Sequence, residues 1–108
     1  MGKFQIKKLT NSFRFFMKAG NGQTILTSEV FRTKKDCLNA IESVKQNASD
    51  KNRYEFKKSL NLKHYFNVTD IDGNIIGSSE MYESSSGRDV GIELVKVNAP
   101  MAVLEDLT

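Results

Sequence analysis

One pair of reactive side chains occurs twice in this sequence of 108 residues. Ser28-Glu29 recurs fifty-one positions later as Ser79-Glu80, each time just ahead of an aromatic residue. A nucleophilic serine needs a base within hydrogen-bonding reach, and the single histidine, His64, stands where the first copy has Phe13. A Ser-His arrangement is therefore open to one copy at most. We interpret these serines and glutamates as structural groups that bond exposed amides of the following turn and helix start.

Metal chemistry has few ligands to draw on. Cys37 and His64 are the only soft pair in the sequence, which is too few ligands for zinc. Periodicity places Cys37 on an apolar helical stripe, where it is a small core residue, and it places His64 toward the core.

Asp70, Asp72 and Asp89 could meet in space, which keeps an enzyme site at a repeat interface as an alternative. No catalytic residue, metal or cofactor is indicated.

A second set of repeated polar residues lies at the predicted helix ends. Lys45-x-Asn47 recurs as Lys96-x-Asn98 in the last turn of each helix. Lysine there complements the negative end of the helix dipole, and asparagine suits a left-handed terminal position. Helix termination accounts for Asn47 and Asn98 without a ligand.

The alternation of the predicted strands leaves one sheet face open to a ligand. Cations interleaved with Phe16 and Tyr65 on such a face are the chemistry by which bases stack and phosphates pair. The same residues also describe a solvated or self-associating face, which is the more common case. The candidate binding residues are Lys7, Arg14, Phe16, Lys18, Lys57, Tyr65 and Asn67, and the outward set also includes Gln5, Glu55 and Thr69.

The composition indicates a globular domain with a mild basic bias. Hydrophobic residues make up 39% of the chain and charged residues 27%, with a net charge of +3 and a pI near 9.0. This bias suits weak attraction to anions and falls short of a dedicated nucleic-acid binder. A lone cysteine, the lack of an apolar run long enough to span a bilayer and the lack of a signal-peptide core predict a cytoplasmic protein with no membrane partner.

Three strands and a helix are predicted in the first half of the chain. Alternating patterns mark strands over residues 3–8, 13–19 and 23–31, with Asn21-Gly22 as a tight hairpin turn. The phase of the third strand is ambiguous, which predicts a bulge or an early end. A helix then runs from an N-cap at Thr33, with Asp36 completing a capping box, to Asn47.

The second half repeats this plan. Strands are predicted over residues 54–58, 64–70 and 74–82, with Asp72-Gly73 in the hairpin position, followed by a helix over 88–97. Ser84, Ser85 and Ser86 offer several N-caps for this helix, with Ser86 and Asp89 at capping-box spacing, and Pro100 ends it. A short strand over 103–105 is predicted to pair at a sheet edge.

The two halves form an internal repeat. Between residues 13–48 and 64–99, eleven of thirty-six positions are identical, where chance gives about two. The first strands align if the turn over residues 59–63 carries one extra residue. A unit of about fifty residues is marginal alone. We therefore predict one α+β domain over 1–108, with repeats over 3–49 and 53–108, whose two βββα units share one antiparallel sheet with both helices on one face.

The sequence resembles the YegP-like family of small tandem-repeat proteins. The resemblance rests on residues 21–31 and 40–48 and on their second-half counterparts, and covers residues 4–99. It implies two three-strand-plus-helix units, each with a trailing strand, merged into a single sheet. It implies no activity, cofactor or catalytic residue.

Three functions are consistent with these patterns. The first is a small cytosolic, non-catalytic binding or interaction module that uses the open sheet face, with a protein partner or a second copy as its ligand. The second is weak binding of single-stranded nucleic acid by the same face, and the third is the interface enzyme. One further residue is singled out because Arg88 replaces Cys37 on the helical stripe. Its guanidinium is expected to pair with Glu80, Asp70, Asp72 or backbone carbonyls.

Overall fold

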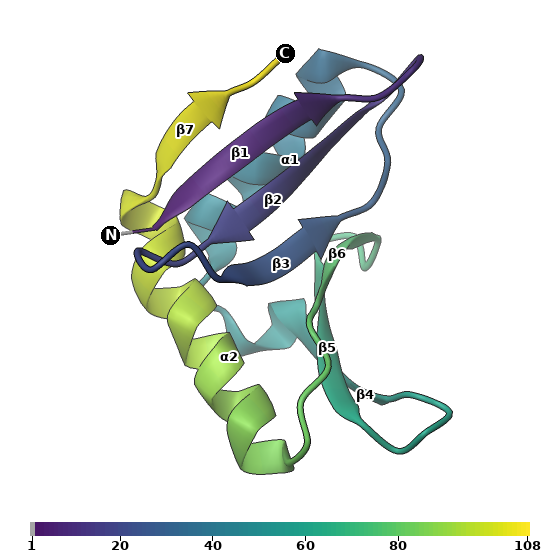
Figure 1. The fold of residues 1–108 in the computed structure, drawn as a ribbon, viewed down its shortest axis with the longest axis vertical. Helices are drawn as coiled ribbons and strands as arrows, with labels where there is room; N and C mark the ends of the chain where they lie inside the picture. Colours follow the sequence, from purple (N-terminus) through teal and green to yellow (C-terminus); the bar gives the residue numbers. More distant parts are fainter. Residues whose placement is uncertain (1) are drawn as a thin grey trace.

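The computed structural model describes residues 2–108 and confirms the predicted α+β fold. Two βββα units follow one another, each with its helix after its third strand (Figure 1). The elements are β1 (Lys3–Lys8), β2 (Phe13–Lys18), β3 (Thr24–Ser28), α1 (Lys34–Asn47), η1 (Lys51–Arg53), β4 (Tyr54–Lys58), β5 (His64–Thr69), β6 (Ile75–Ser79), α2 (Ser85–Asn98), η2 (Ala99–Met101) and β7 (Val103–Asp106).

A single sheet of seven strands contains both units, in the order β4-β5-β6-β3-β2-β1-β7. The units meet where β3 pairs with β6, and the equivalent residues Thr27 and Ser78 face each other there, on a pseudo-two-fold axis. The strands approach closely at this seam, since a Cβ on Gly77 would lie 2.8 Å from the Thr27 carbonyl oxygen. Every pairing is antiparallel except the last, in which β7 runs parallel to β1.

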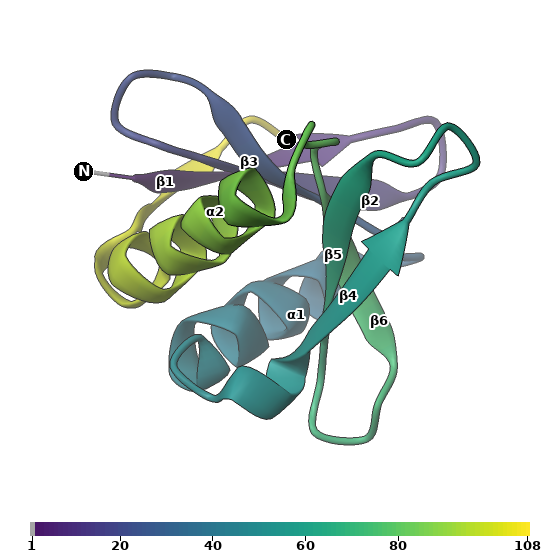
Figure 2. The ribbon, with the colours of Figure 1, turned by 90° about the horizontal axis from the view of Figure 1, so that it is seen from below.

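The sheet bends sharply at this seam, and both helices lie inside the bend (Figure 2). The predicted placement of both helices on one face is therefore confirmed. Each helix buries a narrow stripe against the sheet, Cys37, Ala40, Ile41 and Val44 in α1 and Gly91, Ile92 and Val95 in α2. Because each stripe is narrow, neither helix can cover a sheet by itself.

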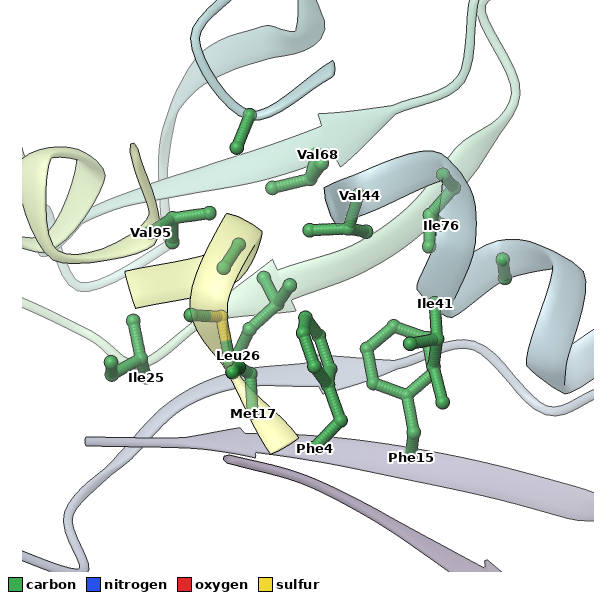
Figure 3. Close-up of a cluster of buried hydrophobic side chains, with 14 of the residues drawn as sticks. Phe4, Phe15, Met17, Ile25, Leu26, Ile41, Val44, Val68, Ile76 and Val95 are labelled. Carbon is green, nitrogen blue, oxygen red and sulfur yellow. The ribbon is translucent and has the colours of Figure 1, made fainter. Parts of the chain in front are cut away.

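The buried core draws on both repeats. Phe4, Phe15 and Met17 of the first unit lie close to Val68 and Ile76 of the second, with side chains of both helices between them (Figure 3). The rings of Phe4 and Phe15 meet edge to face at 5.6 Å, an arrangement that aromatic pairs favour. The two units thus bury their apolar faces in one another rather than in two separate cores.

The hairpin turns follow the sequence prediction. Gly22 and Gly73 have φ angles of +86° and +87°, so the predicted positive φ is confirmed at both. The third strands are shorter than predicted, because β3 ends at Ser28 and β6 at Ser79, and a bulge interrupts their pairing with β2 and β5. Phe31 and Tyr82, placed inside those strands by the sequence, instead form isolated bridges with Phe13 and His64.

The helix starts are partly as predicted. Thr33 caps α1 by accepting the Asp36 N–H at 3.0 Å, which confirms that N-cap. Ser84, one of the three serines predicted to offer the cap of α2, accepts the Gly87 N–H. The predicted start of this helix is wrong, because it begins at Ser85, three residues before Arg88. Among the three successive serines, Ser84 provides the cap, so the pair Ser86 and Asp89 does not start the helix.

Candidate binding surface on the outer sheet face

Four cations surround one aromatic ring on the face of the sheet that the helices leave open. β1 and β2 pair there as Lys3 with Lys18, Gln5 with Phe16 and Lys7 with Arg14. Their partners on the other face, such as Phe4 and Met17, are fully buried, so alternation turns these six side chains outward. We name Lys3, Lys7, Arg14, Lys18 and the ring of Phe16 the cationic patch.

The charges of the cationic patch are only partly compensated. The Lys3 Nζ lies 3.4 Å from the Glu105 Oε1 of β7, and the Gln5 Nε2 donates to the same oxygen at 2.5 Å. The Gln5 hydrogen bond, followed by Lys3, holds the pKa of Glu105 below its usual value. Among residues 2–108, the other three cations of the patch form no ion pair with an acidic side chain.

Two side chains of the cationic patch are held in place by contacts other than ion pairs. The Arg14 Nε donates to the Ser28 carbonyl oxygen at 3.0 Å, and the Lys7 Nζ lies 5.3 Å from the centroid of Phe16. The second contact is a cation–π interaction. The patch therefore presents an ordered ring and a fixed guanidinium, and neither contact neutralises the positive charge of Lys7 or Arg14.

Three predicted binding residues lie in the other half of the sheet. A row of outward positions crosses all seven strands, and it runs Glu55, Asn67, Ser78, Thr27, Phe16, Gln5, Glu105. Lys57 and Tyr65 pair beside this row on β4 and β5, so β6 and β3 separate them from Phe16. Asn67 is buried, and its amide oxygen accepts the Ser78 hydroxyl at 2.6 Å. The sequence-predicted set thus forms two groups, and Asn67 presents little surface to a ligand.

Lys3 belongs to this surface but is absent from the binding residues predicted from the sequence. Its side chain faces outward beside Lys18 and completes the cationic patch. The signal was present, because Lys3 has the same parity as Gln5 and Lys7 in the first alternating strand. Its partner Glu105 could not have been found this way, since the parallel pairing of β7 with β1 is set by the tertiary fold.

The repeated serines occupy equivalent buried positions. Ser28 Oγ accepts the Phe15 N–H at 2.9 Å and donates to the Glu29 carbonyl oxygen, and Ser79 Oγ does the same with Phe66 and Glu80. Each hydroxyl replaces a ladder bond where the third strand leaves its neighbour, whereas the sequence interpretation assigned them to the amides of the next turn. Neither hydroxyl bonds to His64. The side chains of Glu29 and Glu80 are exposed.

Asn47 and Asn98 are equivalent as well. Their Nδ2 atoms donate to the carbonyl oxygens of Ser43 and Leu94, four residues earlier in each helix, at 3.0 and 2.8 Å. The predicted left-handed conformation at Asn47 is wrong, because among residues 2–108 the only residue other than glycine with positive φ is Leu62. The side-chain bonds close the last turn without a left-handed residue.

The soft ligands do not form a metal site. Cys37 is fully buried in the α1 stripe, and burial raises the pKa of its thiol to about 11, so it is unreactive at neutral pH. His64 is half-buried, and its Nδ1 has no hydrogen-bond partner within residues 2–108. That part of the chain contains no group of three histidine, cysteine, aspartate or glutamate side chains placed to hold a metal ion.

A hollow at the repeat interface contains two of the predicted carboxylates. It measures about 440 Å³ and lies between α1 and the β5–β6 turn, with Asp36, Asp70 and Asp72 among its lining residues. Desolvation acts to raise the pKa of Asp70, but hydrogen bonds from Asn74 and from the Asp72 amide outweigh it and hold this pKa below its usual value. Asp70 is therefore occupied in forming its own turn. Asp89, the third aspartate that could have met them, lies on α2 and does not line this hollow.

The predicted partners of Arg88 are wrong. Its guanidinium bonds to the neighbouring Asp89 carboxylate at 3.1 Å and lies 3.9 Å from the centroid of Phe56. The side chain is only 14% exposed, because its stem packs on the helix side of the sheet edge. Neither Glu80 nor the β5–β6 turn reaches it. Arg88 therefore covers an aromatic ring rather than neutralising a distant acid.

These features define a class of protein, a tandem-repeat α+β domain with one open, partly cationic sheet face. The chain belongs to the UPF0339 family, because the family model described as a domain of unknown function (DUF1508) matches residues 10–55 and 61–106. The two matches begin fifty-one residues apart, which is the offset between the aligned halves of the sequence. The resemblance to the YegP-like family is thereby confirmed.

Relatives of known sequence and structure span almost the whole chain. It is 44% identical to UPF0339 protein YegP of Escherichia coli K12 over 99% of this chain and 98% of that one. It is 47% identical to a UPF0339 protein of Acinetobacter baylyi over 89% of this chain and 86% of the relative. The solution NMR structure of the Shewanella oneidensis UPF0339 protein matches with a TM-score of 0.93 at 42% identity, covering 99% of this chain and 92% of that one. No helix within residues 2–108 is long and apolar enough to cross a membrane.

Proposed function

We propose that this protein is a small, non-catalytic binding module of the cytoplasm that recognises an anionic partner through the cationic patch. One observation carries this proposal. Lys3 stands opposite Lys18 and Lys7 opposite Arg14, and like charges directly opposite each other on paired strands destabilise a sheet. An anionic partner would offset that repulsion on binding.

The second repeat supports this interpretation as an internal comparison. Aligning β4 and β5 on β1 and β2 through the registers Phe56–Phe66 and Ile6–Phe15 puts Lys57 and Tyr65 where the first repeat has Lys7 and Arg14. One cation thus faces an aromatic ring there, and the like-charge pair is absent. The fold therefore does not require paired cations at these positions.

A cytoplasmic location remains part of the proposal. It is supported by the lone cysteine, which is buried and free.

The proposal is tested by capture from cell lysate, with and without nuclease. The double variant Lys7→Glu/Arg14→Glu reverses the charge of two patch cations that have no acidic partner within residues 2–108. Lys35→Glu/Lys51→Glu, at two exposed sites away from this face, makes the same change in net charge. We expect the wild type and the control to retain the same acidic macromolecules and the patch variant to lose them. Equal retention by all three proteins would contradict the proposal.

Weak binding of single-stranded nucleic acid is the second candidate, and Phe16 is the observation that favours it. A half-buried ring among cations combines a stacking surface with phosphate ligands. We expect a labelled single-stranded oligonucleotide to bind with an affinity that falls with salt, and removing one patch cation should reduce the slope of log affinity against log salt by about 0.7. Phe16→Ala should lower affinity at every salt concentration with the slope unchanged. Equal affinity for all variants would exclude this ligand.

A further inference from the structure

The strand β4 is an open edge of the sheet, whereas its counterpart β1 is covered. β4 is the outermost strand on the side of the second repeat, and β7 occupies the outermost position beside β1. The pairings Phe56–Phe66 and Ile6–Phe15 make Phe56 the equivalent of Ile6. The pseudo-two-fold axis therefore relates the edge at β1 to the edge at β4, and only the edge at β1 is covered by another strand, β7.

Backbone hydrogen-bonding groups of β4 point away from the sheet. The N–H groups of His64 and Phe66 donate toward β6, to the Tyr82 carbonyl oxygen and to Ser79 Oγ. In an antiparallel pair, the residues opposite them must turn their own N–H and C=O groups to the other side. Lys58 and Phe56 thus present these groups at the open edge. At the covered edge, the equivalent Ile6 carbonyl oxygen accepts the Leu107 N–H at 2.9 Å.

The open edge also leaves an aromatic side chain in water. Ile6 is fully buried, while its equivalent Phe56 is 61% exposed. Arg88 covers one side of the Phe56 ring, and a hollow of about 280 Å³ between Phe56 and α2 continues the surface toward Ile92. An exposed ring beside unpaired backbone groups is a surface that another strand can cover.

We propose that β4 pairs antiparallel with β4 of a second copy of this chain, about a two-fold axis through Phe56. Each Phe56 then exchanges both backbone hydrogen bonds with its counterpart, and the two rings meet on the helix side of the sheet. Glu55 of each copy faces Lys57 of the other on the outer side, and Tyr54 faces Lys58. The strand is thus self-complementary in charge, as an isologous interface requires.

Charge selects this register over its neighbours. The two-fold axis could instead pass through Glu55 or Lys57, one position along the strand, and the two β4 strands would still pair antiparallel. It sets Glu55 opposite Glu55 in the first case and Lys57 opposite Lys57 in the second, and both arrangements oppose like charges. The axis through Phe56 is the one that pairs opposite charges at both flanking positions.

The interface is small, so the dimer should dissociate on dilution. β4 contains five residues, and the Tyr54 N–H is already donated to the Lys51 carbonyl oxygen. Such an edge contact falls at the low end of stable interface sizes. The two sheets would join into one, and the cationic patches of both copies would lie on the same outer side of it.

Sedimentation equilibrium over a range of concentrations tests this proposal on the full chain. We expect the wild type to dimerise as its concentration rises and both Glu55→Lys and Lys57→Glu to stay monomeric. Mixing these two variants restores opposite charges at both pairs, so an equimolar mixture should form a heterodimer. Lys7→Glu, at the equivalent position on the covered β1, should dimerise as the wild type does.

Three outcomes would overturn the proposal. The wild type could remain monomeric at every concentration, which would leave the edge to water or to another partner. The single variants could dimerise as strongly as the wild type, or the mixture could remain monomeric, and either result would exclude this pairing. Circular dichroism of each variant shows whether the fold is retained, because both substitutions lie on the solvent side of an edge strand.

Discussion

The two repeats share a backbone plan and differ in what covers it. In the first repeat, β7 lies beside β1 and Ile6 is fully buried. In the second, no strand of residues 2–108 lies on the outer side of β4, and Phe56 is 61% exposed. The outer sheet faces differ as well, because like charges pair across β1 and β2 while Lys57 pairs with Tyr65 across β4 and β5. Features that both repeats share are therefore those that the fold requires, whereas features found in one repeat alone reflect the surroundings of that surface.

The helices show the same division. The buried positions Ile41 and Val44 recur as Ile92 and Val95, because both helices pack on the same sheet. On the opposite side, Asn39 is replaced by Val90, which is 62% exposed, and Gln46 by Val97, which is 69% exposed. Symmetry about the shared core preserves the inner residues, while the outer residues of each repeat are free to diverge.

The largest expected effect comes from separating the repeats. Residues 1–50 alone would leave β3 without β6 and would expose core side chains that pack on the second repeat. We expect this fragment to lack a cooperative unfolding transition as a monomer, measured by circular dichroism and denaturant titration. A cooperatively folded monomeric fragment would contradict this prediction, whereas a folded homodimer would not, because a second copy can replace the missing half.

A matched pair of substitutions compares the two edges directly. Ile6→Ala removes a fully buried side chain and should lower the free energy of unfolding by about 2–5 kcal/mol. Phe56→Ala removes a ring that is largely exposed and should cost less than about 1.5 kcal/mol in the monomer at low concentration. Denaturant unfolding measures both values. Equal costs would mean that β4 is covered in solution as β1 is.

The hairpin glycines should behave alike in the two repeats. Both have φ near +87° in open turns, where no residue of 2–108 other than the two chain neighbours comes within 4 Å of an added Cβ. Gly22→Val and Gly73→Val should each cost about 1–2 kcal/mol, because a β-branched side chain is strained at positive φ whatever the space around it. Denaturant titration of the two variants provides the test. A cost in one repeat alone would show that the turns are not equivalent.

The smallest effect concerns the strand that covers the first edge. Hydrogen bonds from Lys34 and Thr108 hold the pKa of Asp106 well below its ordinary value of 3.8, and that of Glu105 is also lowered. A carboxylate with a lowered pKa stabilises the fold above its unfolded-state value and loses that contribution as the pH falls through the folded-state value. The attachment of β7 should therefore weaken below about pH 4.

Amide exchange measured by NMR tests this loss. The Leu107 amide, which donates to the Ile6 carbonyl oxygen, should lose protection in acid before the core amides do. Amides of β2 serve as the control, because they pair within the sheet interior. Unchanged protection of Leu107 until global unfolding would show that the two carboxylates do not tether β7.

Sequence alone determined the architecture, because the same pattern of strands, glycine turn and helix occurs in both halves of the chain. Alternation and the glycine turns placed the strands to within a few residues, and the apolar stripes placed both helices on one face. The hydrogen-bond partners of the repeated serines could not be predicted in this way. Their recurrence marked them, but the partners of Ser28 and Ser79 are the Phe15 and Phe66 amides on the neighbouring strands, where β3 and β6 end. No sequence signal specifies which ladder bond a side chain replaces at a strand end.

Only the tertiary structure decided which surface side chains act together. Lys7 and Phe16 lie next to each other because β1 and β2 pair in one register, while the seam between β3 and β6 separates both from Tyr65. Arg88 contacts Phe56 because the fold places α2 beside β4. Local patterns fix the face on which a side chain lies, but strand order and helix crossing depend on packing between residues distant in sequence, which periodicity does not encode.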